Sequence, residues 1–452
     1  MNVVFLFSDE HSASATGYSG HRVVQTPNLD RLAEQSYTFD NAYCNSPICT
    51  PSRLSMLTGR YPHQIEAWDL GAIANPDRHR TWGHHLPDYE TVLCGRTHFN
   101  GQERRMGFER RLLDDLPMWN NERGRPPRRG PDARRGSNSH VTECGPGLHP
   151  HTSYDTLATH LSVEYLTEKI GSPGNRPFLL YCGYMRPHFP LIPHPDYYDL
   201  YDPETLNLPD TWNEPLEQQH PVIQHVRWAW RNEVPPPESI VRCATASYYA
   251  LITHMDHAIG RILDTIDESP LRENTVVIYT SDHGEMAGHH GIWQKQCFYE
   301  EAVRVPLMVR LPKGESGGRI EQNVSLVDIL PTLLDVTGHD TPGDLPGRSL
   351  LEIARQESRQ TTRAVFSEYH HMGMPDAGFM LKKGNHKLCH YVGNDPQLFD
   401  VRNDPLENED LATDPAHQET LADLDRTLRE LIDPDQVNDR CKKDQAERAG
   451  RN

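Results

Sequence analysis

Short apolar runs recur along the chain, and polar residues follow each of them. Four runs have the length and the β-branched content of buried strands, and they occupy residues 3–7, 178–182 and 275–279 and the stretch "ETVLCGRTHFNG". A fifth strand is expected at residues 306–309. In a parallel sheet the polar residues that follow such strands meet at the carboxyl edge, where ligands bind.

Helical patterns lie between these strands. Residues 240–266 carry apolar side chains at spacings of three and four, and residues 154–170 place Leu157, Leu161 and Tyr165 on one face. Strands that alternate with helices predict an α/β fold, in which a mostly parallel central sheet is flanked by helices on both faces.

The alternation of strands and helices stops towards the end of the chain. Residues 377–392 predict a hairpin, and residues 417–432 predict an amphipathic helix. We therefore expect a main α/β domain at residues 1–355 and a small C-terminal α+β subdomain at residues 356–452.

One segment of the main domain, residues 102–151, has a different composition. Ten arginines lie between Arg104 and Arg135, together with many prolines and glycines and without a clear period. The segment is expected to be a long surface insertion or lid. It is either a solvated loop or a rim that attracts anions over a pocket.

Composition narrows the setting in which the protein works. The net charge of −19 argues against a general nucleic-acid binder. The apolar run at residues 3–7 is too short for a signal peptide or a membrane span. Nine scattered cysteines make a disulfide framework improbable. These features predict a cytoplasmic protein that binds neither nucleic acid nor membrane.

Four residues capable of binding a metal follow two strands that are far apart in sequence: Asp9, Glu10, Asp282 and His283. Any one of them alone would usually be a helix cap or a surface carboxylate. Brought together, their hard oxygens and one imidazole suit Ca²⁺, Mg²⁺ or Mn²⁺ better than zinc. The majority of oxygen ligands favours Ca²⁺.

The stretch "NSPICTPSRLSMLTGR" places Cys49 at the start of an expected helix, with Arg53 one turn later. The residues alone leave three interpretations open for Cys49. It could be a buried thiol, a thiolate nucleophile, or the precursor of a modified residue.

The sequence "CTPSR" resembles the C-x-P-S-R signature of the formylglycine-dependent sulfatases. Residues 26–63 and 281–312 are similar to this family throughout, and residues 398–412 resemble its C-terminal signature. The resemblance covers most of the chain. It implies an alkaline-phosphatase-like α/β sandwich, with the catalytic domain at residues 1–355.

The resemblance also implies a chemical role for Cys49. In this family a formylglycine-generating enzyme oxidises the cysteine to an aldehyde, which hydrates to a geminal diol. One hydroxyl attacks sulfur and expels the alcohol, and the other then collapses and releases sulfate. Cys49 would bind one divalent metal together with Asp9, Glu10, Asp282 and His283. Many members have Asp at the position of Glu10 and Asn at that of His283.

Further roles follow from matched positions. Arg53 would hold the aldehyde hydrate, and His188 and Lys295 would grip sulfate and assist the leaving oxygen. His98 could take a proton from the diol. Arg96 falls where many members have Lys, and it can only hold and neutralise charge. The remaining neighbouring histidines are interpreted as bystanders: His84, His85, His289, His290, His370 and His371. Cys44 is expected to be structural.

These implications predict a sulfuric ester hydrolase that cleaves the S–O bond of a small-molecule or saccharide sulfate. Residues 93–112 are similar both to the bacterial choline sulfatase branch and to phosphonate monoester hydrolases. One alternative is therefore a phosphonate monoester or phosphodiester hydrolase, and a second is a catalytically silent, sulfate-binding homologue. The arginines of residues 102–151 hint at a further anionic group on the substrate. Family analogy allows a homo-oligomer.

Overall fold

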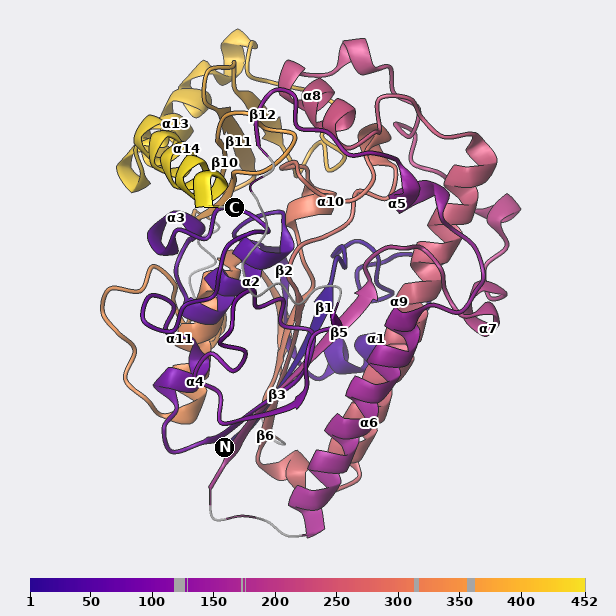
Figure 1. Cartoon of the computed structure of the whole chain (residues 1–452), viewed down its shortest axis with the longest axis vertical. Coiled ribbons are helices and arrows are strands. Elements are labelled where there is room, and N and C mark those ends of the chain that lie inside the picture. The colour runs from indigo at the N-terminus through magenta and orange to yellow at the C-terminus, as the bar shows by residue number, and fades with distance from the viewer. Residues whose placement is uncertain are drawn as a thin grey trace.

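The computed structural model describes residues 1–117, 127, 129–171, 174, 176–312, 317–355 and 362–451. A large sheet lies at the centre with helices on both faces, and a smaller sheet lies beside it (Figure 1). Part of the expected insertion, with Arg123, Arg125 and Arg128, lies outside the described residues. Residue 356, where the C-terminal subdomain was expected to begin, also lies outside them.

The large sheet has eight strands in the order β4-β3-β5-β1-β6-β7-β2-β8. β7 is antiparallel to both of its neighbours, and the other described pairs are parallel. The strands are β1 (Asn2–Asp9), β2 (Tyr37–Tyr43), β3 (Glu90–Gly95), β4 (Arg110–Leu113), β5 (Phe178–Pro187), β6 (Thr275–Ser281), β7 (Leu307–Arg310) and β8 (Gly318–Ser325). The mostly parallel central sheet is thus confirmed.

All five strands predicted for this sheet are present, as β1, β3, β5, β6 and β7, and its other three strands, β2, β4 and β8, were missed. The missed strands β4 and β8 form the two edges of the sheet. Their sequences "RRLL" and "GRIEQNVS" are polar or charged, because an edge strand exposes one side and needs no continuous apolar run. β4 also shows that part of the expected irregular insertion is a regular strand.

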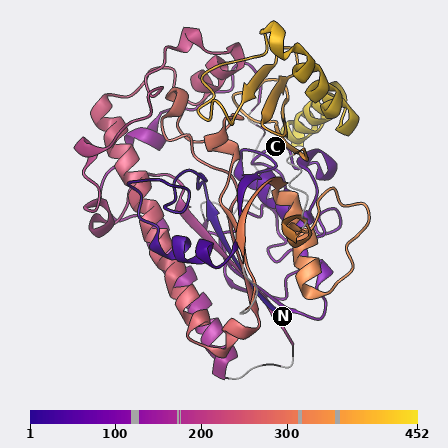
Figure 2. The same ribbon diagram turned by 180° about the vertical axis from the view of Figure 1, so that it is seen from behind.

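Helices α1 (Pro27–Glu34), α6 (Pro150–Gly171) and α9 (Glu238–Asp267) cover one face of the large sheet, as Figures 1 and 2 show. Both long helices were predicted. Leu157 of α6, however, is exposed, whereas Ala158 and Leu166 are buried against the sheet. Tyr165 is also buried and Leu161 packs against the same cluster, so two of the three residues predicted to share a face lie towards the sheet and Leu157 does not.

Helices α2 (Cys49–Thr58) and α11 (Ile329–Thr337) pack on the opposite face of the sheet. Shorter helices connect these elements: α3 (Pro62–Ile65), α4 (Trp82–His85), α5 (Ser139–Thr142), α7 (Pro195–Tyr198), α8 (Pro221–Ala229), α10 (Glu300–Val303) and α12 (Leu350–Arg355). Among the described residues of this region, five short 3₁₀ segments lie in the loops: η2 (Pro203–Thr205), η3 (Leu216–Gln218), η4 (Pro270–Glu273), η5 (His289–Gly291) and η6 (Leu326–Asp328).

The second sheet is antiparallel, in the order β12-β11-β10-β9. It is built from β9 (Ala364–Tyr369), β10 (Gly378–Lys383), β11 (His386–Tyr391) and β12 (Gln397–Asp400), and α13 (Gln418–Leu431) and α14 (Pro434–Arg451) accompany it. Leu424 and Leu428 of α13 pack on the sheet. The predicted hairpin is β10–β11, and the predicted helix is α13, so the C-terminal α+β region is confirmed.

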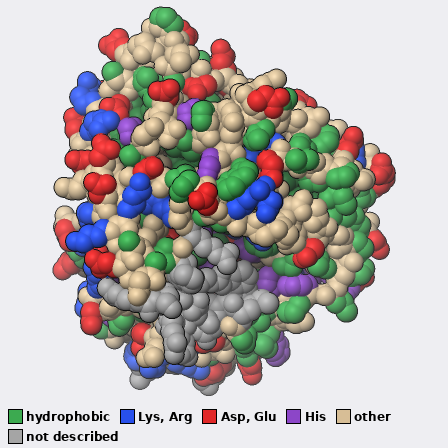
Figure 3. All heavy atoms as spheres, turned by 45° about the horizontal axis from the view of Figure 1, so that its top comes forward, with side chains coloured by type: hydrophobic (Ala, Val, Ile, Leu, Met, Phe, Trp, Pro, Cys, Tyr) green, Lys and Arg blue, Asp and Glu red, His purple; other side chains and the backbone are tan. Residues whose placement is uncertain are grey.

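The surface carries charges of both signs. On the face shown in Figure 3, acidic and basic side chains are interspersed among polar and apolar ones. Among the described helices, none combines the length and the apolar character that a membrane crossing needs. A cytoplasmic location stays a prediction from the sequence.

Candidate active site

Helix α2 begins at Cys49 and is buried along its whole length. The preceding residue, Ile48, is extended, so the chain enters the helix directly at Cys49. Gly59 ends the helix with φ 65°, a left-handed conformation that glycine adopts without steric cost. The helix therefore presents the side chain at position 49 from its first turn, as the sequence predicted.

The tips of β1 and β6 lie next to each other because these two strands pair in parallel. Ser8 is in register with Ser281, so the residues that follow them, Asp9 and Asp282, reach the same edge of the sheet. The two tips are also linked by a hydrogen bond, since the backbone N–H of Glu10 donates to the side-chain Oδ1 of Asp282 over 3.1 Å. Register alone thus joins two tips that are far apart in sequence.

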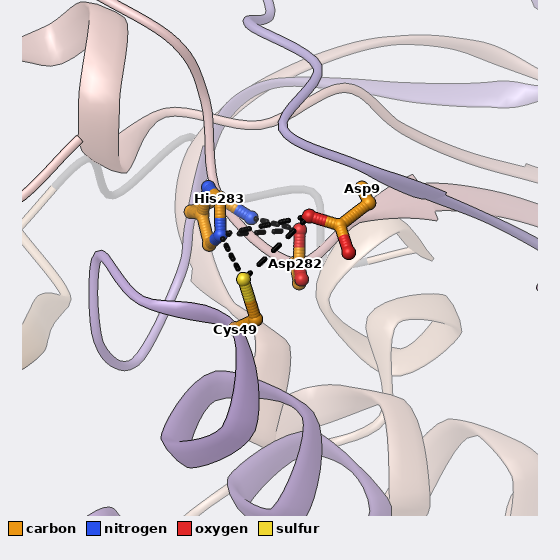
Figure 4. Close-up of side chains that lie close together, drawn as sticks. All are labelled: Asp9, Cys49, Asp282 and His283. Carbon is orange, nitrogen blue, oxygen red and sulfur yellow. Dashed lines mark hydrogen bonds and ion pairs between the residues drawn. The ribbon is translucent and has the colours of Figure 1, made fainter. Parts of the chain in front are cut away.

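Asp9, Cys49, Asp282 and His283 converge at this edge (Figure 4). Each offers one potential ligand atom, and these atoms lie within 4.8 Å of one another. His283 Nε2 is 3.2 Å from Cys49 Sγ and 3.6 Å from Asp282 Oδ1, and Cys49 Sγ is 3.6 Å from Asp9 Oδ1. We call these four residues, together with Arg53, the floor of the site.

Two buried arginines neutralise the carboxylates of the floor. Arg53 contacts Asp9 Oδ2 through Nη2 at 3.0 Å and Asp282 Oδ2 through Nε at 2.8 Å. Arg96 Nε lies 2.8 Å from the same oxygen of Asp9. Burial by itself would raise the pKa of Asp9, but the charges of Arg53 and Arg96 hold that pKa well below its usual value. Asp9 is therefore ionised although it is fully buried.

Glu10, His188 and Lys295 form a second group beside the floor. Lys295 Nζ is 2.8 Å and His188 Nε2 is 3.5 Å from Glu10 Oε2. Burial raises the pKa of Glu10 above its usual value, although Lys295 opposes this shift. Burial, and then the charge of Lys295, lower the pKa of His188.

The single five-residue metal set expected from the sequence is therefore divided between two groups. Glu10 groups with Asp9 and His188, whereas Cys49, Asp282 and His283 group with Asp9. The backbone of Glu10 explains the division, because its φ of 72° lies in the left-handed region and turns the side chain away from the strand direction. Such residues concentrate at functional sites.

Arg96 and His98 reach the floor because β3 makes a sharp turn at Gly95. Gly95 has a φ of +88°, and a Cβ at this position would lie 2.2 Å from the carbonyl oxygen of Gly183 in β5. Only glycine fits here. Arg96 Nη2 lies 3.0 Å from His98 Nδ1 after this turn.

The expected insertion supports this loop. Asp115 Oδ1 accepts a 3.0 Å hydrogen bond from the backbone N–H of His98, and Arg111 Nη2 lies 3.1 Å from Asp115 Oδ2. Arg111 therefore stabilises the loop that carries Arg96 and His98. The arginine-rich segment was interpreted either as a solvated loop or as a rim that attracts anions. Arg111 fits neither interpretation, because it pairs with Asp115.

A cavity of about 400 Å³ opens above Cys49. The sequence predicted four of its lining residues: Cys49, His98, His188 and Lys295. The others are Ile48, Leu70, Gly71, Arg135, Gly136, Ser137, Phe189, Trp230, Gln294, His371 and Met372. His371, interpreted as a bystander, thus lies on the wall, while the remaining histidines of that set do not line this cavity.

The missed lining residues come from loops and from element ends. Arg135 was visible only as one of ten arginines, and Gln294 only as a neighbour of Lys295 in a matched motif. Trp230 directly follows α8, and His371 follows β9. No periodic pattern marks such positions, so the sequence offered no signal for Trp230 and only a histidine pair for His371.

Comparison with known families defines the class of this site. A model described as sulfatase matches residues 1–339, and a model described as N-sulphoglucosamine sulphohydrolase, C-terminal, matches residues 288–434. The chain therefore belongs to the sulfatase family and is an enzyme that hydrolyses sulfate esters.

Individual relatives agree with this assignment. The chain is 29% identical over 429 residues to choline-sulfatase from Rhizobium meliloti, covering 92% of this chain and 83% of the relative. It is 29% identical over 465 residues to arylsulfatase K from Mus musculus, covering 97% of this chain and 80% of the relative.

Solved structures agree on the fold. A phosphonate monoester hydrolase from Agrobacterium radiobacter superposes with a TM-score of 0.77 at 21% identity, covering 95% of each chain. A protein in complex with its substrate D-glucosamine-2-N,6-O-disulfate gives a TM-score of 0.73 at 22% identity, covering 95% of this chain and 97% of that one. The predicted alkaline-phosphatase-like α/β sandwich is confirmed.

Proposed function

We propose that this sulfatase cleaves the S–O bond of a sulfate monoester through a formylglycine at position 49 and one divalent metal. The observation that carries the proposal is the position of Cys49 Sγ. It lies at the first turn of a buried helix, 3.2 Å from His283 Nε2 and 3.6 Å from Asp9 Oδ1. A cysteine with only a packing role would not need two carboxylates and an imidazole around its sulfur.

The donor set of the floor fits a divalent cation. Asp9, Asp282 and His283 would hold it with the side chain at position 49, and Glu10 would join only if its side chain turned from Lys295. Two carboxylates favour Ca²⁺ or Mg²⁺, and the imidazole also allows Mn²⁺. When bound, the metal supplies positive charge that polarises a sulfate oxygen and acidifies a hydroxyl.

The residues of the chain have distinct roles in this proposal. Arg53 keeps Asp9 ionised, and its contacts with Asp9 and Asp282 fix the orientation of both carboxylates. Lys295 and His188, on the cavity wall, bind the sulfate oxygens and offset charge on the leaving oxygen. Arg96 Nη2 donates to His98 Nδ1 over 3.0 Å, so the neutral ring carries its proton on Nε2 and His98 would donate a hydrogen bond to an oxygen in the cavity. For His98 to take a proton as sulfate is released, its contact with Arg96 would have to open. A formylglycine-generating enzyme would be needed for maturation.

Mass spectrometry of the peptide that contains Cys49 tests the central step. We expect the mass of an aldehyde in place of a thiol at position 49, and an unmodified thiol at Cys44 in the same region. Conversion of Cys49→Ala should abolish sulfate release, whereas Cys44→Ala should retain it. An active preparation in which position 49 is entirely thiol would contradict the proposal.

Two further measurements separate the alternatives. Metal content after dialysis should show one bound divalent cation, and Asp282→Asn should lower that content independently of activity. Rates with paired aryl sulfate and phenylphosphonate esters rank the two enzyme reactions. A phosphonate rate well above the sulfate rate would favour a phosphonate monoester hydrolase. Absence of both activities in a protein whose position 49 remains a thiol would favour the silent, sulfate-binding homologue.

A further inference from the structure

The upper wall of the cavity is an apolar and cationic surface, separate from the floor. We call its five residues the rim: Arg135, Phe189, Trp230, His371 and Met372. The guanidinium carbon of Arg135 lies 5.5 Å from the ring centroid of Phe189 and 5.4 Å from that of Trp230. These distances are typical of cation–π contacts.

The position of Arg135 is fixed by its backbone as well. Its N–H donates to the carbonyl oxygen of Ala229 over 2.8 Å, and its own carbonyl accepts from Arg231 Nε over 2.7 Å. Trp230 is in turn linked to another rim residue, because its indole N–H donates to the carbonyl oxygen of Met372 over 3.0 Å. Arg135 is thus held beside Trp230 by the two residues that flank Trp230 in the sequence, Ala229 and Arg231.

The polar groups of the wall are mainly donors. Gln294 is 1% exposed, and its Nε2 has no hydrogen-bond partner among the described residues, while its Oε1 accepts from Gln296 over 3.1 Å. Lys295, the next residue, adds an ammonium group. None of the described residues that line the cavity is acidic. A ligand that fills this space must therefore supply acceptors.

Resting on the proposed sulfatase reaction, we propose that the alcohol half of the substrate is a ring that carries a second anionic group, such as a carboxylate. Arg135 binds this group on the platform formed by Phe189 and Trp230, and Gln294 donates to a ring substituent or a sulfate oxygen. A cavity of about 400 Å³ has the size of a small-ligand pocket. Arg135 is then the residue that sets substrate specificity.

The same geometry opposes a substrate with a quaternary ammonium group. Aromatic faces bind such cations when the faces are open and a carboxylate lies nearby. Here the positive charge of Arg135 lies over the ring of Phe189 and over that of Trp230. The described lining offers no carboxylate to offset a second cation. Choline sulfate is therefore expected to bind poorly, although one relative is a choline-sulfatase.

Binding to the full-length Cys49→Ala variant tests this inference without turnover. The probes are 4-carboxyphenyl sulfate, its apolar counterpart 4-methylphenyl sulfate, and choline sulfate, measured by titration calorimetry with Ca²⁺ in the buffer. We expect the carboxylate probe to bind about tenfold more tightly than the methyl probe, because a charge-assisted hydrogen bond is gained. Choline sulfate should be the weakest of the three.

Variants at two arginines assign the preference to Arg135. In the Cys49→Ala background, Arg135→Ala should remove the tenfold preference and leave the affinity for the methyl probe within about twofold. Arg135→Lys should retain part of it, since it keeps the charge but not the planar guanidinium. Arg105→Ala, which removes an exposed arginine of the same segment, is the matched control and should retain all of it.

Each outcome decides the inference. Equal affinities for the two aryl probes, tighter binding of choline sulfate, undetectable binding of all three, or an equal loss for both aryl probes in Arg135→Ala would overturn it. Failure of the proposed reaction is recognised separately. In that case the unsubstituted enzyme releases no sulfate from any probe, whatever the binding preference of the Cys49→Ala variant.

Discussion

The floor and the rim of the cavity are built in opposite ways. The floor residues Asp9, Arg53, Asp282 and His283 have no exposed surface, and strand tips or a buried helix fix each of them. The rim residues come from loops and element ends, and Arg135 and Phe189 are only half-buried. In the floor, charges of both signs contact each other, whereas the rim carries a cation on two rings.

This difference separates chemistry from recognition. A sulfate group is the same on every substrate, so the groups that act on it can be fixed rigidly by the sheet. The alcohol differs between substrates, and loop residues can vary without disturbing the sheet. We therefore expect changes in the floor to affect folding and every substrate, and changes in the rim to affect selected substrates.

The largest effect is expected from Arg53→Gln. This change leaves two buried carboxylates without their main partner, so the free energy of unfolding should fall by about 3–5 kcal/mol and activity should be lost. Urea denaturation with a chelator present measures the fall. The matched change Arg60→Gln removes a surface ion pair with Asp344 and should cost less than about 1 kcal/mol. Equal costs for the two variants would contradict the comparison.

Lys295→Met should mainly affect the reaction. Loss of one preorganised charge at the sulfate position should lower kcat by about 10²–10³ for every sulfate ester. Initial rates with an aryl sulfate and with a carboxylated aryl sulfate measure this, and both should fall equally. Lys383→Met removes an ion pair with Asp423 on the surface and should leave kcat unchanged. A fall in kcat for only one of the two substrates would show that Lys295 recognises the alcohol half, as the rim does, and not the sulfate group.

A smaller effect is expected at Glu368, a buried residue of β9. Its carboxylate accepts from His63 and His370, and these contacts outweigh burial and lower its pKa to about 2. Because the pKa is depressed in the folded state, this stabilisation is complete above the ordinary value of 4.5 and is lost as pH falls towards about 2.

Glu368→Gln should therefore cost about 1–3 kcal/mol at neutral pH, and the difference from the unsubstituted protein should shrink below about pH 4.5. Thermal unfolding as a function of pH measures the difference. A difference that stays constant down to pH 2 would show that Glu368 does not act as a carboxylate.

The fold was predictable where burial produces an apolar pattern in consecutive residues. The runs that became β1, β3, β5, β6 and β7 are buried on both faces, so each is nearly continuous in apolar residues. The edge strands β4 and β8 need no such run and were missed. In the same way, the position of Cys49 at a helix start was predictable, whereas the exposure of Leu157 was not.

The sequence by itself determined the central strands, the order in which they occur and the polar residues at their tips, because these features are encoded by neighbouring residues. Through its resemblance to a family, the sequence also indicated that Asp9, Cys49, Asp282 and His283 meet, but the tertiary structure alone decided how the expected metal set divides and which residues line the rest of the cavity. The left-handed backbone of Glu10 directs its carboxylate to Lys295 and not to Cys49, and loop packing places Arg135 on Phe189 and Trp230. Such contacts join residues that are distant in sequence, and their geometry depends on the paths of loops that no local pattern specifies.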